Sequence, residues 1–486
     1  MAELKTARGT QALLDLEDRA PDVLFEQVGD SPVPLWPQFR SRVSVALNAL
    51  DYQIAPVRGR EQARSNAWRG LARSFVPSRR DAVFARGQTR LCFLAGGTTV
   101  HDVAGRERNW LIGDFAEQNA GQASVLQWAP IPSRLGPPAF SATWSMDNVK
   151  TRSAGFAKLS RRDPAPRVRT IVAEVIRQLD VRLSEEQVAA IVAAAVYHER
   201  VRPHIDQAFG RILDRLDPSV VVMDGASYGG WASMTSMMKD RGIVVAEPQH
   251  GWIGPTHAAY NFGSAMYREP LRRTLPDELL TFGEYWGRGL RFPGRITAIG
   301  KPHIEKAAAT VPMPVAARSE VLVVSSTADP DEMSLFVLSL REKLDSRWTV
   351  VFRPHPAERK VLSERYPRLM SVEGIRIDTG GDVYESLGTA AVVIGIASTV
   401  LFEALAFGCR VFVRDSALVD YYVVDRFGPT IKGETDLAKV ANQINAHDLS
   451  QQHLSVASSD MWATGAVERF QEWLETVPRL ESDPPH

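Results

Sequence analysis

The chain has 486 residues, of which 44% are hydrophobic and 23% are charged. This composition is typical of a folded soluble protein, and the length is too great for one hydrophobic core, so we expect two or three domains. Lysine plus arginine and aspartate plus glutamate both number 57, and this balance removes the usual electrostatic argument for a nucleic-acid partner.

Residues 1–85 are rich in arginine and proline and show no clear periodicity, so we interpret them as an N-terminal extension. The start of the chain lacks the apolar stretch of a signal peptide. Cys92 and Cys409 both lie within apolar runs, which indicates core residues rather than a disulfide and favours a reducing compartment. The longest apolar stretch, 390–402, is shorter than the roughly 20 residues of a membrane span. We therefore expect a cytoplasmic protein, with peripheral attachment to a membrane complex left open.

Residues 86–312 contain short apolar runs that end in glycine or polar residues, which is the pattern of buried parallel strands. Apolar residues at three- and four-residue spacing predict helices between these runs. The strands that we expect are Arg90–Ala95, Ser124–Trp128, Ser219–Gly225, Ile243–Glu247, Leu279–Phe282 and Ile296–Ile299, and the helices are Val168–Leu216 and Tyr228–Asp240. We assign these residues to an N-terminal Rossmann-like domain.

Residues 313–456 alternate strands and helices more regularly and predict a second α/β domain with a doubly wound parallel sheet. The strands that we expect are Val321–Val324, Thr349–Phe352, Ile375–Ile377, Ala391–Ile396 and Arg410–Val413, and the helices are Glu332–Leu344, Ala357–Tyr366, Val383–Gly388 and Thr399–Phe407. Prolines 312 and 314 mark a linker before this domain. Residues 457–486 include an amphipathic helix, Ser459–Val477, which we expect to pack back on the first domain.

Ligands of doubly wound sheets bind beyond the carboxyl ends of the strands, so polar residues at these ends are the candidate site. Arg353 and His355 follow the strand Thr349–Phe352, and two prolines hold the loop around His355 rigid. We interpret the loop as a donor of hydrogen bonds to a phosphate oxygen. The alternative is that His355 caps the next helix.

Ser398 and Thr399 stand where the strand Ala391–Ile396 passes into a helix. The first N–H groups of a helix are unpaired and attract an anion, so a diphosphate can bind there. Glu403, one turn further along, is placed to reach ribose hydroxyls. The alternative is ordinary N-capping by Ser398 with an exposed Glu403.

The first domain offers its own strand-end residues. Gln249, His250 and Gly251 follow the strand Ile243–Glu247, and His257 and Tyr260 lie in the next loop. His250 is a candidate catalytic residue because a second strand-end histidine, His355, could face it across a cleft.

Asp224 ends the preceding strand of the first domain, where it fits a general base or a turn former equally well. Lys301, after the strand Ile296–Ile299, is placed either to contact a donor phosphate or to serve as a hinge. His101 and Asp102 are a weaker candidate pair. No cysteine–histidine cluster, Walker loop or dinucleotide glycine motif is present, so we expect neither a metal nor a cofactor.

Together these segments resemble bacterial capsule and surface-polysaccharide transferases of the GT-B fold. The resemblance covers roughly residues 219–415 and rests on Gln249-His-Gly with His257 and Tyr260, Ile299-Gly-Lys-Pro, Arg353-Pro-His-Pro, and Ser398-Thr with Glu403. The group includes CDP-glycerol glycerophosphotransferases and the sialyl- and Kdo-transferases that use CMP-sugars. It implies two Rossmann-like domains facing across a cleft. The acidic-acidic-Gly motif of the sialyltransferases has one acidic residue missing here, at Met223-Asp224-Gly225.

The resemblance implies a metal-independent glycosyltransferase, or glycerophosphotransferase, of surface polysaccharide synthesis. It would transfer from a CMP-, CDP- or UDP-linked donor to a hydroxyl of a saccharide or lipid-linked acceptor, in association with a membrane assembly complex. His250, His355 and Asp224 would be catalytic; Arg353, Ser398, Thr399, Glu403 and Lys301 would bind the donor; and Gln249, His257 and Tyr260 would lie on the acceptor side. The alternatives are a UDP-sugar 2-epimerase and a non-catalytic scaffold of the same fold.

Overall fold

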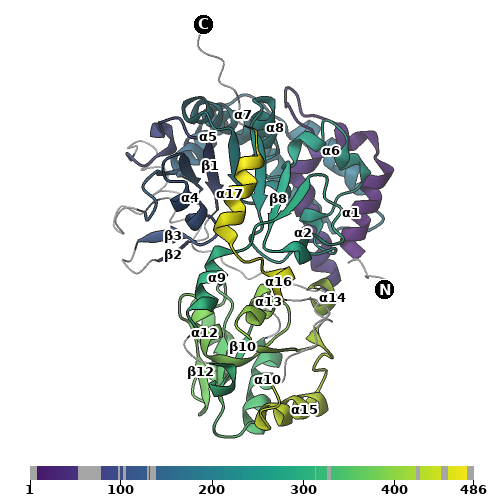
Figure 1. Ribbon diagram of the computed structural model, residues 1–486. Coiled ribbons are helices and arrows are strands. Elements are labelled where there is room, and N and C mark those ends of the chain that lie inside the picture. Colours follow the sequence, from purple (N-terminus) through teal and green to yellow (C-terminus); the bar gives the residue numbers. More distant parts are fainter. Residues whose placement is uncertain are drawn as a thin grey trace.

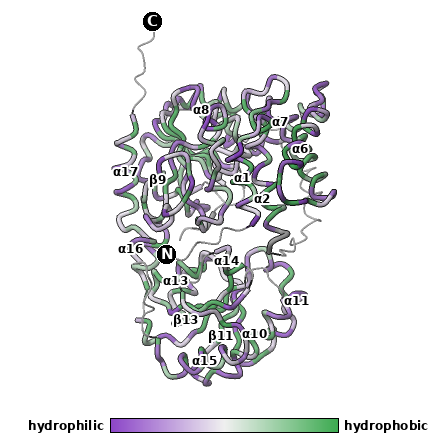
Figure 2. The backbone as a smooth tube through the Cα atoms, turned by 90° about the vertical axis from the view of Figure 1, so that its right-hand side faces the viewer, coloured by the Kyte–Doolittle hydropathy of each residue, from purple (hydrophilic) through white to green (hydrophobic). Residues whose placement is uncertain are grey.

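The computed structural model describes residues 8–52, 78–96, 99–101, 106–128, 131, 138–311, 314–325, 330–416, 418–422, 427–449 and 458–478. The chain forms two lobes, each built on its own parallel sheet (Figure 1). The hydrophobic stretches of the chain lie inside both lobes (Figure 2). Among the described residues, no helix has the length and apolar character needed to cross a membrane.

The N-terminal domain contains a seven-stranded sheet in the order β5-β4-β1-β6-β7-β8-β9, with every neighbouring pair parallel. Its strands are β1 (Leu91–Ala95), β4 (Ala123–Gln127), β5 (Thr143–Ser145), β6 (Val220–Met223), β7 (Val244–Pro248), β8 (Glu278–Thr281) and β9 (Arg295–Ala298). A separate antiparallel hairpin joins β2 (Thr99–His101) and β3 (Glu107–Asn109). Successive strands are added on one side of β1 up to β5 and on its other side from β6 onward, so the gap between β1 and β6 is the topological switch point of this Rossmann-like sheet.

Alternate residues of β1 point to opposite faces of this sheet, and both faces are covered by helices. Cys92 and Leu94 belong to the core under α5 (Asp147–Leu159), α7 (Glu185–Leu216) and α8 (Ala232–Asp240). Leu91 and Phe93 belong to the core on the other face, with α4 (Gly113–Gln118) and α17 (Ala466–Thr476). Burial on both faces explains why the strands are continuous apolar runs.

The region that we interpreted as an N-terminal extension contributes to the core of this domain. Helices α1 (Arg8–Arg19) and α2 (Trp36–Tyr52) pack on each other and bury Trp36 and Phe39 completely. Glu17 of α1 accepts hydrogen bonds from the Arg40 Nε atom at 2.6 Å and from the Gly263 backbone at 2.8 Å. These contacts tie the first helices to a loop more than 200 residues away.

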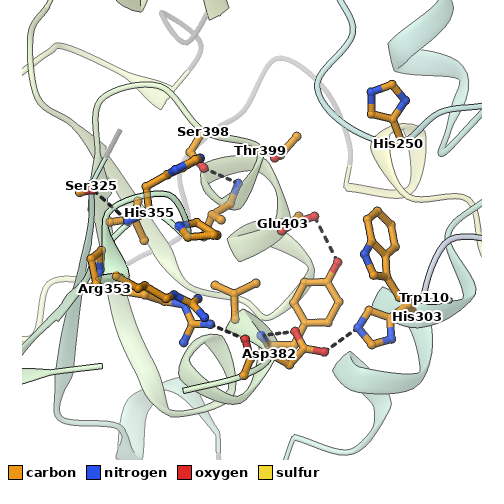
Figure 3. Close-up of a pocket in the computed structure, with 18 of the residues that line it drawn as sticks. Trp110, His250, His303, Ser325, Arg353, His355, Asp382, Ser398, Thr399 and Glu403 are labelled. Atoms are coloured by element: carbon orange, nitrogen blue, oxygen red, sulfur yellow. Dashed lines mark hydrogen bonds and ion pairs between the residues drawn. The ribbon is translucent and has the colours of Figure 1, made fainter. Parts of the chain in front are cut away.

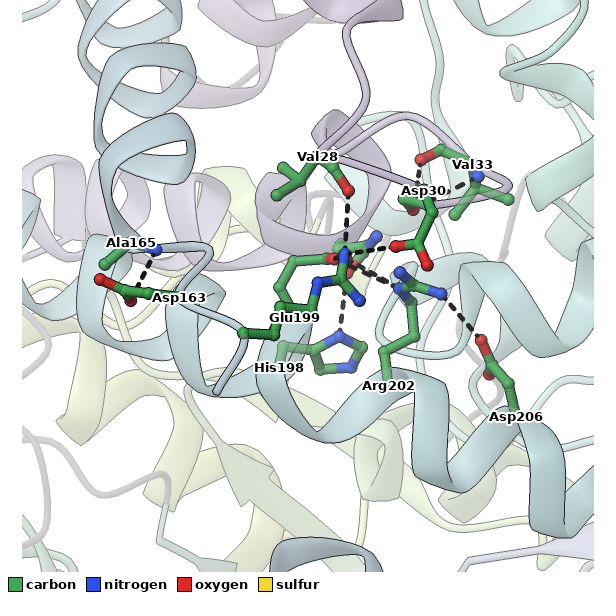
Figure 4. A network of polar contacts seen from close by, with 12 residues as sticks. Val28, Asp30, Val33, Asp163, Ala165, His198, Glu199, Arg202 and Asp206 are labelled. Carbon is green, nitrogen blue, oxygen red and sulfur yellow. Dashed lines mark hydrogen bonds and ion pairs between the residues drawn. The ribbon is translucent and has the colours of Figure 1, made fainter. Parts of the chain in front are cut away.

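The long helical run expected over Val168–Leu216 is two helices, α6 (Ala165–Arg177) and α7. Ser184 and Gln187 form a capping box that starts α7, so a new helix begins where the apolar periodicity alone indicates continuation. The middle of α7 carries a buried ion network (Figure 4), in which Arg202 lies between Glu199, at 3.1 Å, and Asp206, at 3.2 Å.

The C-terminal domain contains a five-stranded parallel sheet in the order β12-β11-β10-β13-β14. Its strands are β10 (Glu320–Val324), β11 (Thr349–Arg353), β12 (Ile375–Ile377), β13 (Ala390–Gly395) and β14 (Arg410–Val413). Helices α10 (Pro330–Lys343) and α15 (Glu434–Asn445) cover one face, and α12 (Val383–Thr389) and α13 (Thr399–Ala406) cover the other. Two Rossmann-like α/β sheets that face across a cavity are the GT-B arrangement, so the predicted fold class is confirmed.

The prediction of one helix over Ala357–Tyr366 is wrong. The segment forms a 3-10 turn (Arg359–Val361) followed by the single turn of α11 (Leu362–Arg365). The reason is Glu358, whose side chain is fully buried and accepts a hydrogen bond from the Tyr366 hydroxyl at 2.8 Å. This contact draws the segment inward, away from a regular helical path.

The chain passes between the domains twice. The first passage follows α9 (Pro302–Ala309), and the second precedes α16 (Ser458–Met461), which leads into α17 on the N-terminal domain (Figure 1). The segment after α16 contacts both domains, because the Trp462 indole donates to the Phe402 carbonyl at 3.2 Å and the Ala463 backbone donates to the Phe282 carbonyl at 2.8 Å. Phe470 of α17 stacks on Phe115 with ring centroids 4.4 Å apart.

Candidate functional site

A cavity of about 430 Å³ lies at the carboxyl ends of β10, β11 and β13, where the C-terminal sheet has its own switch point (Figure 3). The C-terminal domain lines it with residues that follow these three strands, and the N-terminal domain closes the opposite side. The lining residues with polar side chains or indole rings are Trp110, His250, Lys301, His303, Ser325, Arg353, His355, Arg359, Asp382, Tyr384, Ser398, Thr399 and Glu403. Seven of the predicted donor-site and catalytic residues thus meet in one place, five from the C-terminal domain and two, His250 and Lys301, from the N-terminal domain.

Ser398 and Thr399 form the start of α13 at this cavity. Ser398 is the N-cap, and its hydroxyl oxygen accepts a hydrogen bond from the Val400 backbone at 3.2 Å. Ser398 therefore caps the helix, as the alternative interpretation predicted. Ser398 and Thr399 also line the cavity. The positive end of the α13 dipole is thereby directed into the cavity, where it would favour an anion.

His355 presents one nitrogen to the cavity. Its Nδ1 atom accepts a hydrogen bond from the Ala357 backbone at 3.2 Å, so in the neutral ring the proton is on Nε2. Partial burial lowers the pKa of His355, and the nearby Glu358 only partly offsets this. The imidazole is therefore neutral near pH 7 and can donate one hydrogen bond from Nε2.

Glu358 fixes the loop that carries His355, and sequence reasoning missed it. The His355 backbone N–H donates to Glu358 at 3.1 Å and to the Ser325 hydroxyl at 3.0 Å. The Arg365 guanidinium donates to the same buried carboxylate at 2.6 Å. The only signal in the sequence was a glutamate three residues after His355, and nothing there indicated its burial.

Arg353 lines the cavity, but its guanidinium makes hydrogen bonds to other residues of the protein. It donates to Asp378 at 2.6 Å and to the carbonyls of Gly380 and Gly381 at 3.1 and 2.8 Å. Burial alone would raise the pKa of Asp378, yet its hydrogen bonds, including those from Ser386 and Arg353, lower it. Arg353 thus holds the loop after β12 in place, which is a supporting role rather than the predicted direct contact with the donor.

Arg359 is the cavity cation that sequence reasoning missed. Its side chain makes no hydrogen bond or ion pair with any residue that the structure describes, and its Nε atom is buried. Burial lowers the pKa of Arg359, and the neighbouring Arg353 adds to the effect. The Asp378 carboxylate attracts Arg359 only at longer range, and a partly buried cation that makes no direct ion pair with the described residues is a ready partner for a phosphate.

Lys301 and Glu403 were each expected to contact the donor, but in the structure their side chains contact each other. The Lys301 Nζ atom lies 2.6 Å from a Glu403 carboxylate oxygen, and both side chains are more than 90% buried. Tyr384 donates to the same carboxylate oxygen at 3.1 Å, and the Lys301 ammonium lies 4.5 Å from the centroid of the Trp110 ring. The predicted ribose contact of Glu403 and phosphate contact of Lys301 are therefore replaced, in this structure, by an interdomain ion pair.

A second interdomain contact was not predicted. His303 Nε2 lies 2.6 Å from the Asp382 carboxylate, which also accepts the Tyr384 backbone N–H at 3.0 Å as the N-cap of α12. Burial alone would raise the pKa of Asp382, but these hydrogen bonds outweigh it and lower the pKa. The Lys301–Glu403 ion pair and the His303–Asp382 hydrogen bond join α9 to the C-terminal domain beside the cavity.

His250 is one of two histidines that the N-terminal domain places at the cavity, the other being His303, and Asp224 lies behind it. The His250 Nδ1 atom is 3.3 Å from an Asp224 carboxylate oxygen, a distance of ion-pair contact without hydrogen-bond alignment. The other Asp224 oxygen accepts the Gly96 backbone N–H at 3.2 Å. Asp224 thus belongs to the end of β6 and contacts His250 at the end of β7, so the two alternative bases form one pair.

The predicted acceptor-side residues lie beneath His250 and do not line the cavity. Gln249 is fully buried; its side chain accepts the Phe282 backbone N–H at 2.8 Å and donates to the Gly251 carbonyl at 2.8 Å. His257 Nδ1 accepts the Ala259 backbone N–H at 3.3 Å, and burial lowers the pKa of His257 to about 3. These contacts give both side chains supporting roles.

Tyr260 donates a hydrogen bond to Glu247, a fully buried carboxyl group, at 2.9 Å. The Ser227 backbone N–H donates to the other oxygen at 2.6 Å. Burial raises the pKa of Glu247 to about 7, against these hydrogen bonds, which lower it. The His101–Asp102 pair falls outside the residues whose side chains the structure describes.

The raised pKa of Glu247 predicts a pH-dependent stability. Between about pH 4.5 and 7 the folded protein binds a proton that the unfolded chain has lost, so the free energy of unfolding falls as pH rises through this window. Glu247→Gln has no such group. We expect its free energy of unfolding, relative to wild type, to increase by about 1–3 kcal/mol between pH 4.5 and 8, as measured by urea denaturation. A difference that does not change with pH would contradict the assignment.

No model of a protein family matches the sequence, and no curated protein matches it. Solved structures are similar to this chain at low identity. They include the UDP-GlcNAc 2-epimerase from Neisseria meningitidis bound to UDP-GlcNAc, with 12% identity over 79% of this chain and 99% of that chain and a TM-score of 0.47.

Two further structures give similar values. The UDP-GlcNAc 2-epimerase from Methanocaldococcus jannaschii in complex with UDP-GlcNAc and UDP is 13% identical over 79% and 99% of the two chains, with a TM-score of 0.44. The alpha,alpha-trehalose 6-phosphate synthase from Burkholderia multivorans is 12% identical over 80% and 93%, with a TM-score of 0.38. At these identities and scores neither a reaction nor a substrate is transferred to this chain.

Proposed function

We propose that this protein transfers a group from a nucleotide-activated donor, in the first instance a sugar, to a hydroxyl acceptor. The observation that supports this most is the opposition of two sets of residues across one cavity (Figure 3). The C-terminal domain contributes donors for an anion, and the N-terminal domain contributes His250, with Asp224 behind it. An anion site facing a candidate base is what transfer from a phosphorylated donor requires.

The donor phosphates would bind between the start of α13, the Arg359 guanidinium and the His355 Nε2–H group. These groups stabilise the negative charge that grows on the leaving phosphate oxygen, which is the main electrostatic task in such a transfer. The start of α13 and the His355 loop are positioned before substrate binds, because Ser398 caps α13 and Glu358 holds the loop. Arg353 supports the neighbouring loop through Asp378.

The acceptor hydroxyl would approach from the N-terminal domain. Its proton passes to Nε2 of His250, and Asp224 orients the ring and stabilises the imidazolium through Nδ1. The acceptor oxygen forms a bond to the transferred group while the bond to the nucleotide phosphate breaks, and the electron pair stays on that phosphate. The resting His250–Asp224 contact is unaligned, and domain closure on the substrate would tighten it.

Nucleotide binding is tested by thermal unfolding with CMP, CDP, UDP and GDP. A nucleotide that binds the folded protein raises its melting temperature by mass action. We expect one of the four to stabilise wild type, and Arg359→Ala to weaken its binding about 10- to 100-fold, because a charge-assisted contact is lost. Arg368→Ala, an exposed arginine outside the cavity, is the matched control and should bind as wild type does.

Each other outcome has a meaning. If no nucleotide stabilises wild type at millimolar concentration, the donor site is wrong and a non-catalytic scaffold is the hypothesis to pursue. If a UDP-sugar binds and is converted without any acceptor, the protein is an epimerase or a hydrolase rather than a transferase. Release of free nucleotide only in the presence of a hydroxyl acceptor supports the transfer.

A further inference from the structure

The end of α5 carries two large apolar side chains that the protein leaves uncovered. Phe156 is 51% exposed, and Leu159, the last residue of the helix, is 81% exposed. Both belong to the N-terminal domain, whose helices α5, α6 and α7 lie in the lobe away from the C-terminal domain (Figure 1). Burying a leucine or phenylalanine stabilises by about 1.5–3 kcal/mol, so exposure of both at one helix end is a feature to explain.

The same helix end is strongly basic. Residues 150–169 contain seven lysines and arginines and a single acidic residue, Asp163, in a chain whose net charge is zero. Arg152, Lys158 and Arg161 are exposed and make no ion pair or hydrogen bond through their side chains with any described residue. The acidic Asp163 is already paired with Arg200, at 2.8 Å. The cations around Phe156 and Leu159 are therefore available to an external anion.

This surface continues onto α7. The ring of Phe156 lies 5.9 Å from that of His204 on α7, and Arg200 is one turn before His204. One further turn back, Tyr197 is 61% exposed. A shallow apolar groove then follows α7 toward α6, lined by Leu183, Val188, Ala189, Val192, Ala193, Val196 and the edge residues Arg169 and Glu185. Exposed apolar groups and unpaired cations thus share one face of the N-terminal domain.

We propose that this face docks on the surface of an anionic lipid bilayer. Unpaired lysines and arginines complement acidic headgroups, and Phe156 and Leu159 would reach the layer just below them, where apolar side chains are buried between basic ones. The attachment is peripheral, since no described helix could span the bilayer. The proposal does not depend on the transfer reaction, because none of these residues lines the cavity between the domains.

Vesicle sedimentation of the full chain tests the electrostatic part. We expect binding to vesicles of phosphatidylcholine with about one third phosphatidylglycerol, because acidic headgroups attract clustered lysines and arginines. Binding should weaken as salt is raised, and vesicles of phosphatidylcholine alone should not bind. The triple variant Arg152→Gln, Lys158→Gln, Arg161→Gln should bind about 100-fold more weakly, at about fivefold for each cation. A matched triple variant in the C-terminal domain, Arg347→Gln, Arg368→Gln, Lys432→Gln, removes the same charge and should bind as wild type.

The contribution of the apolar side chains is tested by the double variant Phe156→Asp, Leu159→Asp. Its control is Leu335→Asp, which changes an exposed leucine of α10 in the other domain. The first variant should lose vesicle binding, and the second should keep it. Unchanged melting temperatures show that both remain folded. The proposal is overturned if wild type does not bind anionic vesicles, if it binds neutral ones equally well, or if the two triple variants lose binding to the same extent.

Discussion

Replacing His250 with alanine should lower the rate of acceptor-dependent donor turnover about 10²- to 10⁴-fold, the usual contribution of a general base. The reason is that His250 lines the cavity and has a carboxylate of its own domain, Asp224, 3.3 Å from its Nδ1 atom, whereas the other N-terminal-domain histidine there, His303, is bound to Asp382. Nucleotide binding should survive, because the anion-binding groups belong to the other domain. The measurement is steady-state turnover together with the thermal shift given by the nucleotide.

Asp224→Asn separates the two members of the pair. It should lower kcat with little change in nucleotide binding, since Asp224 acts through His250 and does not itself line the cavity. His204→Ala, a histidine of α7 outside the cavity, is the matched control and should leave kcat unchanged. If kcat of His250→Ala falls by less than about threefold, His250 is not the general base, because loss of a general base usually lowers the rate far more.

The second large effect is expected at the ion pair between the domains. Lys301→Met should lower the free energy of unfolding by about 3–5 kcal/mol, because it leaves the buried Glu403 carboxylate without its counter-charge. The double variant Lys301→Met, Glu403→Gln should recover most of this loss, since neither partner is then a buried charge. Urea denaturation of both variants and of Glu403→Gln completes a double-mutant cycle.

Lys439→Met is the matched control for this cycle. Lys439 pairs with Asp436 at 3.3 Å on the surface of α15, with the lysine side chain 70% exposed. Exposed pairs contribute about 0–1 kcal/mol, so this variant should unfold almost as wild type does. Equal effects of Lys301→Met and Lys439→Met would mean that the interdomain pair is solvated, contrary to its burial in the structure.

The sequence indicated the sheets well because of how their strands are buried. Strands such as β6 and β13 have helices on both faces, so they are continuous apolar runs that stand out from the helices around them. β5 was missed because its three residues, Thr143–Ser145, have polar side chains at both ends and form no apolar run. The helix expected over Ala357–Tyr366 was wrong because its pattern gave no sign that Glu358 turns inward.

The candidate site was predicted only in part, for a similar reason. Strand-end position was enough to single out His250, His355 and Ser398, which line the cavity as a group. The pairing of Lys301 with Glu403 joins residues 102 positions apart in different domains, and no local pattern carries that information. Arg359 was overlooked because one more arginine in a charged segment has no distinguishing neighbour in the sequence.

The two passages of the chain between the domains also limit how the molecule can move. A single connection would let one lobe twist and swing freely about the other. With two connections, after α9 and before α16, and with the segment after α16 held by both lobes, the remaining freedom is rotation about the line through both crossings. Opening of the cavity is then a hinge rotation of one domain about that line. A protease cut at one crossing would leave the lobes joined at the other.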